Sequence, residues 1–575
     1  MATLDGEHGV TAAALPERLL ASTLAVGAVA VPYLLRGLDD NRLTSWSWVF
    51  GARDPAVLFA LVMAAAAAAH AVAAALPARR AEAVLFLCAF GAGAAFWSEP
   101  EPIVDAARYF TQAKHLELYG PVRFLREWGR EVPAWTDLPL VPFLYGIALR
   151  LSGESRLALQ AFTTLLFAGT AVLTCRIGKM LWDEETGFAA GAFLLAMPYL
   201  LAQVPLALVD VPTAFFLALA TYASLRALER GGAAGVLLAG LTVFLALASK
   251  YSAWLLLSVL PVAAVVPGVA SRRRRLAVAA KILLVAAALA ALAALPRREV
   301  YARQLALLLG YQAPGLRRWG ESFLSTFVFQ VHPFVTAAAI ASAWLAARRR
   351  DARWVIAAWP VLLLVTLGVR RARYLLPAFP MLGLMAAYGL QAIRAAGTRR
   401  AVLACAVLSS LAVGLYGYLP FLKGTSAMNL RRAGEYLDGL PENRVEVMTA
   451  FRPDAEVNPA VSVPILDLFT AKPLAYRDEG IPRPSGRRAE ESTLRFTWEL
   501  GVAAWYAQPA ETGTAAVAVV TDGVAPFPPR VSARLQDLVL DRTFDADDGV
   551  FEHVTQVRVY RLRSVPSPAA TPGSG

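Results

Sequence analysis

The densest group of polar residues that could take part in a chemical reaction lies in one segment between hydrophobic stretches. The segment Ser98–Tyr145 carries Asp105, Arg108, Tyr109 and Asp137. A carboxylate can act as a general base or bind a metal ion, and a guanidinium suits a phosphate leaving group. A polar loop of this kind, between hydrophobic segments, indicates chemistry at a bilayer surface rather than simple anchoring.

More ionisable and aromatic residues lie where later hydrophobic segments begin or end. They are Asp210, Lys250, Tyr251, His332, Arg371, Arg373 and Tyr374. Each has an ordinary explanation: a carboxylate can cap a helix, a lysine can snorkel, and a lone histidine is more often structural. Counting the segments, however, places these residues on the same membrane face as Asp105 and Asp137. The phosphate of a lipid is the natural anion at that depth.

Composition identifies the class of protein. The chain has 575 residues, of which 57% are hydrophobic, and only 17% are charged, against about 25% in soluble domains. Its mean hydropathy is +0.50. A single soluble core cannot bury so much apolar surface, so we expect a polytopic membrane protein.

The net charge of +12 does not indicate a nucleic-acid partner. The arginines form short clusters between apolar runs, as charges that flank membrane spans do. These clusters are Arg79–Arg80, Arg272–Arg275, Arg348–Arg350 and Arg399–Arg400. We therefore expect no nucleic-acid binding.

The cysteines and the N-terminus add two expectations. Cys88, Cys175 and Cys405 lie inside apolar segments without a CxxC motif, which argues against a disulfide framework and a cysteine zinc site. Asp5 and Glu7 precede the first apolar run, where a signal peptide would carry basic residues. The sequence therefore predicts a retained first span.

Apolar runs of about 17–25 residues predict transmembrane helices, because lipid tolerates no open sheet edge. We expect about thirteen spans, at 15–36, 55–77, 81–97, 157–175, 188–208, 212–228, 233–249, 252–269, 276–296, 324–346, 354–370, 374–393 and 401–420. Residues 137–151 are short and contain Pro139 and Pro142, which predicts an interfacial helix. Residues 103–118 predict a second interfacial helix, amphipathic, with Asp105, Arg108, Gln112 and His115 on its polar face.

These elements predict an all-α membrane bundle followed by a small α+β soluble domain. The expected divisions are 1–80 with two extra spans, 81–423 as the membrane core, which includes the loop 98–156 and its interfacial helices, 424–563 as the soluble domain, and 564–575 as a disordered tail. Short β-rich runs such as RVEVMTA, TAAVAVVTD and QVRVYRL indicate its strands, and RRAGEYLDGL indicates a helix. Parity places this domain on the face of Asp105, whereas the basic residues are too evenly distributed to orient the bundle.

Several short motifs, in order, resemble family 39 glycosyltransferases of the C-type membrane superfamily. This group includes protein O-mannosyltransferases and the aminoarabinose transferases that modify lipid A. The resemblance covers about residues 84–419 and rests on Asp105-Ala106-Ala107-Arg108-Tyr109, Leu138-Pro139-Leu140, Asp210-Val211-Pro212, Ala248-Ser249-Lys250-Tyr251 and Arg373-Tyr374-Leu375-Leu376-Pro377. The chain departs from the family pattern at Ala106, where the family has glutamate, and in the two spans that precede the family's usual first one.

The resemblance implies a C-type glycosyltransferase fold and transfer of a sugar from a polyprenyl-phosphate donor at the outer face of the plasma membrane. Asp105 would deprotonate the acceptor hydroxyl, which would invert the anomeric carbon as phosphate leaves. The donor- and acceptor-binding residues would be Arg108, Tyr109, Asp137, Asp210, Lys250, Tyr251, His332, Arg371, Arg373 and Tyr374. A divalent metal ion, with Asp105 as a candidate ligand, stays open, as do the sugar and the acceptor.

Two other classes of function compete with a transferase. A transporter of lipids or polyprenyl-linked glycans would also need many spans with charged residues. The sequence shows no inverted repeat, and its ionisable residues gather at one face rather than at mid-membrane, which favours the transferase. The other class is an inactive paralogue that acts as a scaffold. Ala106 supports it, because the family has glutamate at this position.

Overall fold

The chain forms two compact units, which we describe separately in a computed structural model. The first comprises residues 1–99 and 112–423, and the second comprises residues 100–111 and 424–575. The structure describes residues 8–39, 49–51, 53–75, 81–97, 104–313, 321–424, 427–453, 455–477, 492, 494–499, 501–507, 516–523, 526–546 and 555–562. The predicted tail lies outside the described residues.

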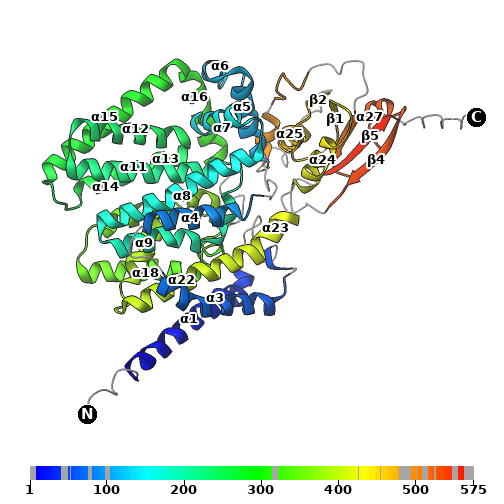
Figure 1. Ribbon diagram of the computed structural model, residues 1–575. Coiled ribbons are helices and arrows are strands. Elements are labelled where there is room, and N and C mark those ends of the chain that lie inside the picture. Colours follow the sequence, from blue (N-terminus) through cyan, green and yellow to red (C-terminus); the bar gives the residue numbers. More distant parts are fainter. Residues whose placement is uncertain are drawn as a thin grey trace, which may run out of the picture. The chain divides into compact units, whose positions relative to one another are not determined.

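The first unit is helical, as the apolar runs predict (Figure 1). Its N-terminal elements are α1 (His8–Leu35), η1 (Arg36–Leu38), α3 (Pro55–Ala75) and α4 (Ala81–Ala94). The loop that follows contains α5 (Asp105–Tyr119), α6 (Pro121–Glu127) and α7 (Leu140–Ser152). Helix α5 is shared between the units, because its residues up to Thr111 group with the second unit.

The remaining elements of the first unit form the helical core. They are α8 (Arg156–Leu181), α9 (Glu184–Ala192), η2 (Phe193–Ala196), α10 (Pro198–Gln203), α11 (Asp210–Arg230), α12 (Ala233–Ser249), α13 (Tyr251–Leu256), α14 (Val259–Val265), α15 (Arg272–Ala294), η3 (Leu295–Arg297), α16 (Arg298–Leu307), η4 (Leu308–Gln312), η6 (Ser325–Gln330), α18 (Pro333–Arg349), α19 (Trp354–Thr366), α20 (Ala372–Leu375), η7 (Leu376–Ala378), α21 (Phe379–Leu390), α22 (Ala396–Val413), η8 (Gly414–Tyr418) and α23 (Leu419–Gly424). Helix α8 packs against α4, α9 and α11, α12 packs between α11 and α15, and α22 packs against α1 and α3.

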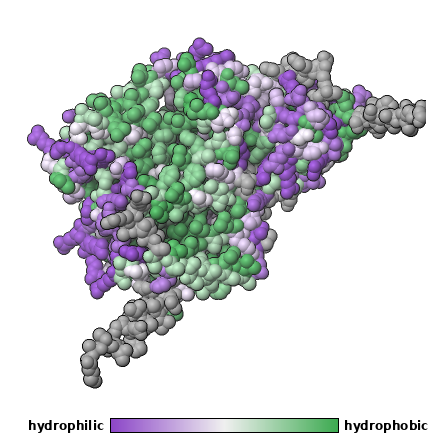
Figure 2. Space-filling view, viewed as in Figure 1, coloured by the Kyte–Doolittle hydropathy of each residue, from purple (hydrophilic) through white to green (hydrophobic). Residues whose placement is uncertain are grey.

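The helices of the first unit carry the apolar surface that a bilayer requires. Within the described residues, five helical stretches are long and apolar enough to cross a membrane: Pro55–Ala74, Arg156–Leu181, Asp210–Arg230, Arg272–Gln312 and Ala396–Lys423. Figure 2 shows hydrophobic surface across this unit, with hydrophilic patches at its margins. A multi-pass membrane protein with a helical bundle, as predicted, is confirmed.

The number of thirteen spans stays a prediction, because several expected spans are interrupted helices. Residues 188–208, for example, form α9, η2 and α10 in succession, and Met197 breaks the helix before Pro198. Proline at the first turn of α10 fits there because its missing N–H would have no partner in any case.

Close packing of small residues fixes two of the core contacts. A side chain at Gly178 of α8 would meet the backbone of Gly187 in α9, and one at Gly389 of α21 would overlap Ala338 of α18. Small residues let membrane helices approach closely, and van der Waals contact then replaces the hydrophobic effect as the driving force. These contacts let α8 approach α9 closely, and α21 approach α18.

The second unit contains a five-stranded mixed sheet, which confirms the predicted mixture of strands and helix in this part of the chain. Its elements are α24 (Met428–Asp438), β1 (Val445–Ala450), η9 (Pro459–Val461), α25 (Ser462–Asp467), β2 (Leu474–Tyr476), η10 (Arg495–Glu499), β3 (Ala516–Thr521), α27 (Pro529–Arg534), β4 (Leu538–Phe544) and β5 (Gln556–Leu562). The strand order is β2-β1-β3-β5-β4, with β1 parallel to β2 and β3, and β5 antiparallel to β3 and β4.

The register of the sheet buries its apolar face. Met448 lies opposite Val519, and both enter a core with Val517 and Val531, the latter from α27. Sequence reasoning identified β1, β3 and β5. It missed β4, whose residues are mostly exposed at the sheet edge, and β2, which has only three residues.

The grouping of the units predicts a membrane topology. Residues 104–111 and the sheet belong to one compact unit, so the loop and the sheet must share one side of the membrane. In a background with Cys88→Ser, Cys175→Ala and Cys405→Ala, single exposed cysteines are introduced by Glu131→Cys, Ser532→Cys and Ala352→Cys. We expect an impermeant maleimide to label the first two from the same side and the third, between α18 and α19, from the other. Labelling of all three from one side would contradict this topology.

Candidate functional site

A buried carboxylate joins three segments of the first unit. Asp210 begins α11 and is 1% exposed. Its Oδ1 accepts a hydrogen bond from Lys250 Nζ, and its Oδ2 accepts one from Arg373 Nε at 2.6 Å. A buried charge of this kind is tolerated only with charged partners, so the ion pairs fix the three segments together.

Each charged group of this cluster stands at a break between helices. Lys250 has extended backbone between α12 and α13, and Arg371 has extended backbone before α20. Asp210 follows the turn after α10. These breaks allow the charged side chains to converge at helix ends, as their positions in the sequence predict.

The cluster carries an excess of positive charge. Tyr374 lies beside two cations, with Lys250 Nζ 4.7 Å and Arg371 Cζ 5.1 Å from the centroid of its ring. Arg371 is 6% exposed. Glu321, also buried, accepts a hydrogen bond from the backbone N–H of Ala372 at 2.7 Å. Among the residues that the structure describes, three basic groups thus accompany two acidic ones, which leaves the cluster suited to an anion.

Asp137 is linked by hydrogen bonds to Tyr251, the residue that follows Lys250. Its backbone carbonyl accepts from Gln304 Nε2 at 2.7 Å, and Gln304 Oε1 accepts from the hydroxyl of Tyr251 at 2.7 Å. Its side-chain Oδ2 accepts from Gln112 Nε2 at 3.0 Å. Trp128 Nε1 is the last group in this series of hydrogen bonds, and it donates to Gln112 Oε1 at 3.1 Å.

The same loop contains a buried histidine that stabilises its fold. The imidazole Nε2 of His115 lies 2.9 Å from Glu127 Oε2. Burial lowers the pKa of His115 and outweighs the effect of Glu127. Burial alone would raise the pKa of Glu127, but its bonds to Arg123 and His115 lower it. At neutral pH the histidine is therefore neutral and donates a hydrogen bond to an ionised carboxylate, which ties α5 to α6.

His332 serves as a helix cap. Its Nδ1 accepts from the backbone N–H of Phe334 at 3.1 Å, so its Nε2 carries the proton and donates to Ser409 Oγ at 3.0 Å. With both ring nitrogens engaged at the start of α18, the structure does not bring this histidine into the cluster around Asp210.

The second unit contains Asp105, Arg108 and Tyr109. Asp105 begins α5, and its Oδ1 lies 3.4 Å from Arg108 Nη2. The guanidinium of Arg108 also lies over the ring of Phe496, 4.7 Å from its centroid, and donates to the hydroxyl of Tyr109 at 3.4 Å. A residue from the C-terminal part of the chain thus packs on the group that pairs with Asp105.

The structure differs from the predicted amphipathic α5 in the exposure of its polar face. Arg108, Gln112 and His115 are 6%, 1% and 4% exposed. They are buried because Asp105, Asp137 and Glu127 provide their partners, whereas the polar pattern suggested contact with water or headgroups. Sequence reasoning also missed the site contacts of Gln304, Glu321 and Phe496. Glu321 alone gave a signal, as an acidic residue just before an apolar run.

The described residues do not fit a metal site. No group of three or more histidine, cysteine, aspartate or glutamate side chains gathers among them. Asp105, the candidate ligand, lies against the guanidinium of Arg108, where a cation would be repelled. We therefore derive no chemical step through a metal ion.

Comparisons with known proteins agree with this reading of the fold. Residues 133–297, which include Asp137, Asp210, Lys250 and Tyr251, match the family described as dolichyl-phosphate-mannose-protein mannosyltransferase. No curated protein sequence matches the chain.

Solved structures give the second comparison. ArnT from Cupriavidus metallidurans bound to undecaprenyl phosphate has a TM-score of 0.55 and 12% identity, over 84% of this chain and 99% of that one. The apo form of the same protein has a TM-score of 0.52 and 12% sequence identity, over the same shares of the two chains. The archaeal oligosaccharyltransferase AglB from Archaeoglobus fulgidus, in complex with an inhibitory peptide and a dolichol-phosphate, gives 0.44 and 12%, over 77% and 69% of the two chains. The predicted resemblance to C-type glycosyltransferases is confirmed, and the chain shares the ArnT fold.

The Asp210 cluster predicts a marked loss of stability on Asp210→Ala. Arg373 would stay buried, and Lys250 partly buried, without their carboxylate; breaking a buried ion pair costs about 3–5 kcal/mol in comparable cases. Glu435→Ala is the matched control, because Glu435 pairs with Arg431 on the exposed surface of α24, where a pair contributes about 0–1 kcal/mol. Thermal unfolding in detergent compares the two variants. Equal unfolding temperatures would show that Asp210 does not hold the three segments together.

Proposed function

We propose that the chain is an integral-membrane, inverting glycosyltransferase that uses a polyprenyl-phosphate-linked sugar. The observation that supports this most directly is the buried cluster of Lys250, Arg371 and Arg373 around Asp210, with its excess positive charge. Preorganised cations stabilise the charge that develops on a leaving phosphate. The ArnT fold and the family match over residues 133–297 support the same class of reaction.

In the proposed reaction, Asp105 accepts the proton of an acceptor hydroxyl. The hydroxyl oxygen attacks the anomeric carbon, and the bond from that carbon to the phosphate oxygen breaks on the opposite side. The electron pair of the broken bond stays with the polyprenyl phosphate. A phosphate leaves without a proton donor, so one base and a group of cations suffice, whereas an inverting glycosidase needs two carboxyl groups.

Within the proposed site, Arg108 orients the carboxylate of Asp105, and Phe496 restricts the guanidinium. The C-terminal part of the chain thereby contributes to the catalytic loop, which supports a role in choosing the acceptor. Ala106, at the position of the family glutamate, is fully buried, so this position adds no second carboxylate to the reaction. We place the reaction at the extracytoplasmic face of the plasma membrane.

Asp105→Asn tests the catalytic base. The variant keeps the size of the side chain but cannot accept the proton, so transfer should fall by at least about a hundredfold. Release of polyprenyl phosphate from a panel of polyprenyl-phosphate sugars measures the reaction. Asp541→Asn, in strand β4 of the same unit, is the control and should leave transfer unchanged. Normal turnover in Asp105→Asn would remove Asp105 from the mechanism, and absence of release by the unaltered protein would contradict the transferase.

Arg371→Ala tests the phosphate-binding role of the cluster. Arg371 is a buried cation of the cluster and lies beside Tyr374, so its removal should weaken binding of the donor phosphate. Loss of a charged hydrogen bond costs about 1.5–3 kcal/mol, equivalent to roughly a 10- to 150-fold loss of affinity. The neighbouring Arg370 is exposed and offers a matched control as Arg370→Ala. Titration with undecaprenyl phosphate measures both variants, and equal affinities would assign the donor phosphate to another part of the chain.

A further inference from the structure

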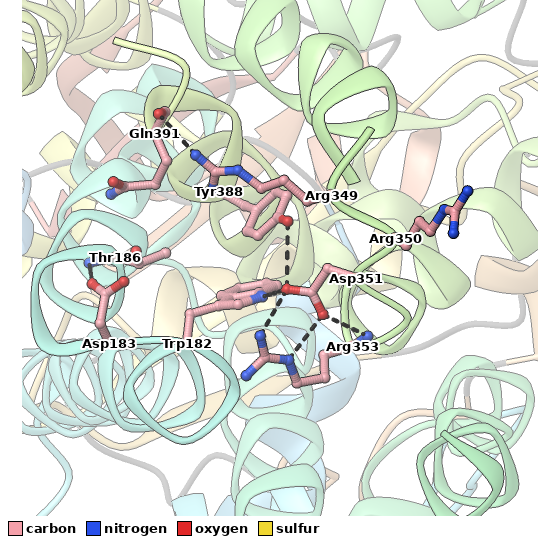
Figure 3. Close-up of a pocket in the computed structure, with 9 residues that line it drawn as sticks. All are labelled: Trp182, Asp183, Thr186, Arg349, Arg350, Asp351, Arg353, Tyr388 and Gln391. Atoms are coloured by element: carbon pink, nitrogen blue, oxygen red, sulfur yellow. Dashed lines mark hydrogen bonds and ion pairs between the residues drawn. The ribbon is translucent and has the colours of Figure 1, made fainter. Parts of the chain in front are cut away.

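A polar pocket lies in the first unit at three neighbouring chain turns. It encloses about 390 Å³. Trp182 and Asp183 line it from the turn between α8 and α9, Arg349 and Asp351 from the turn between α18 and α19, and Tyr388 from the end of α21 (Figure 3). The close contact of Gly178 with Gly187 brings α8 and α9 together near the first of these turns.

The pocket is remote from the Asp210 cluster along the bundle. Arg373 stands just before α21, and Tyr388 and Gln391 stand at its end. Fifteen residues separate Arg373 from Tyr388, a rise of roughly 22 Å in helical conformation. The pocket therefore lies at the opposite end of the helices from the proposed catalytic cluster, and it belongs to the other face of the membrane.

Asp351 binds several of the residues that line the pocket, and its negative charge is balanced by Arg353. It pairs with Arg353 Nε at 2.8 Å and accepts from Trp182 Nε1 at 3.0 Å and from the hydroxyl of Tyr388 at 3.4 Å. Burial acts to raise the pKa of Asp351, but these bonds, chiefly those to Arg353, lower it. The ionised carboxylate and Arg353 thus cancel in charge, and Figure 3 shows the four side chains converging.

Two further arginines give the pocket its net positive charge. Arg349 lies over Tyr388, 5.7 Å from the ring centroid, and donates to the carbonyl of Gln391 at 3.4 Å. Arg350 is exposed and ends α18 in a left-handed conformation, φ 53°. Within the described part of the chain, neither has a carboxylate at ion-pair distance. The remaining acidic group, Asp183, accepts from the backbone N–H of Thr186 at 2.8 Å, so one unit of positive charge is left over.

Aromatic residues place this pocket at the membrane interface. Trp344 is 60% exposed, and the guanidinium of Arg348 lies 5.3 Å from its ring centroid. Trp182 and Trp354 lie at the same helix ends and pack against Leu345, Ala346 and Tyr388. Tryptophan and arginine gather at the depth of lipid headgroups, and basic pockets between transmembrane helices bind the headgroups of anionic lipids.

The ordinary role of arginines at helix ends is to flank a span. Two features go beyond that role here. One is the pocket between three chain turns, and the other is the carboxylate of Asp351, which binds Trp182, Tyr388 and Arg353 around it. Flanking charge alone requires neither. We propose that this pocket binds the phosphate of an anionic membrane phospholipid, with Arg349 and Arg350 as its charged contacts.

The test uses the full-length protein in detergent and titrates it with phosphatidylglycerol, phosphatidylcholine or inorganic phosphate, with binding followed by native mass spectrometry and thermal shift. The pocket variant is Arg349→Gln/Arg350→Gln. The control is Arg394→Gln/Arg400→Gln, which removes two exposed arginines after α21, outside the pocket. We expect phosphatidylglycerol affinity to fall roughly tenfold or more in the pocket variant and to change less than about twofold in the control.

Other outcomes would overturn the proposal. An equal loss in both double variants would show unspecific attraction of charge, and no loss in the pocket variant would exclude the two arginines. Equal binding of phosphatidylcholine would exclude recognition of an anionic lipid, and saturation by inorganic phosphate at equal affinity would make free phosphate the ligand. Arg349→Lys/Arg350→Lys keeps the charge and should restore part of the affinity. A failure to do so in a normally eluting protein would also count against the proposal.

Discussion

The architecture of the helical unit depends on one buried carboxylate. Asp210 is almost completely removed from water, and the cost of burying its charge is offset only where Lys250 and Arg373 meet it. These partners lie 40 and 163 residues away along the chain. The break between α12 and α13 and the short helix α20 must therefore reach the start of α11. Once they do, Arg371 and Tyr374 are brought to the same place.

Hydrogen bonds through two glutamines link Tyr251, which follows Lys250, to the loop before α8. Gln304 links Tyr251 to the backbone of Asp137, and Gln112 links the side chain of Asp137 to Trp128. Amides can donate and accept at once without a charge to bury, which makes them effective connectors in an interior. The loop is thereby held before any ligand binds, as electrostatic preorganisation requires.

Sequence reasoning found Asp210 and its two charged partners but missed the contacts of Gln304, for a physical reason. A charge in an apolar context is costly, so Asp210, Lys250 and Arg373 stand out in the sequence. Gln304 does not stand out, because an amide is tolerated in many environments, and Gln112 was recognised only as part of a polar helix face. The polar pattern of α5 revealed its helix but not its burial, since the burial of Arg108 or His115 depends on partners from distant segments. Hydropathy likewise identified helical segments without their interruptions, such as the one at Met197.

The clusters around Asp210 and Asp351 both combine a carboxylate with several cations, but they differ in how the cations are held. Around Asp210, Arg371 and Arg373 are buried and Lys250 is partly buried, and the carboxylate fixes the geometry of Lys250 and Arg373 in a region of low dielectric constant. Around Asp351 only Arg353 is fixed by the carboxylate, and Arg349 and Arg350 stay exposed. Exposed guanidinium groups discriminate weakly between anions and are screened by salt. The first arrangement fits the proposed stabilisation of a leaving phosphate, whereas the second fits the proposed binding of a lipid headgroup.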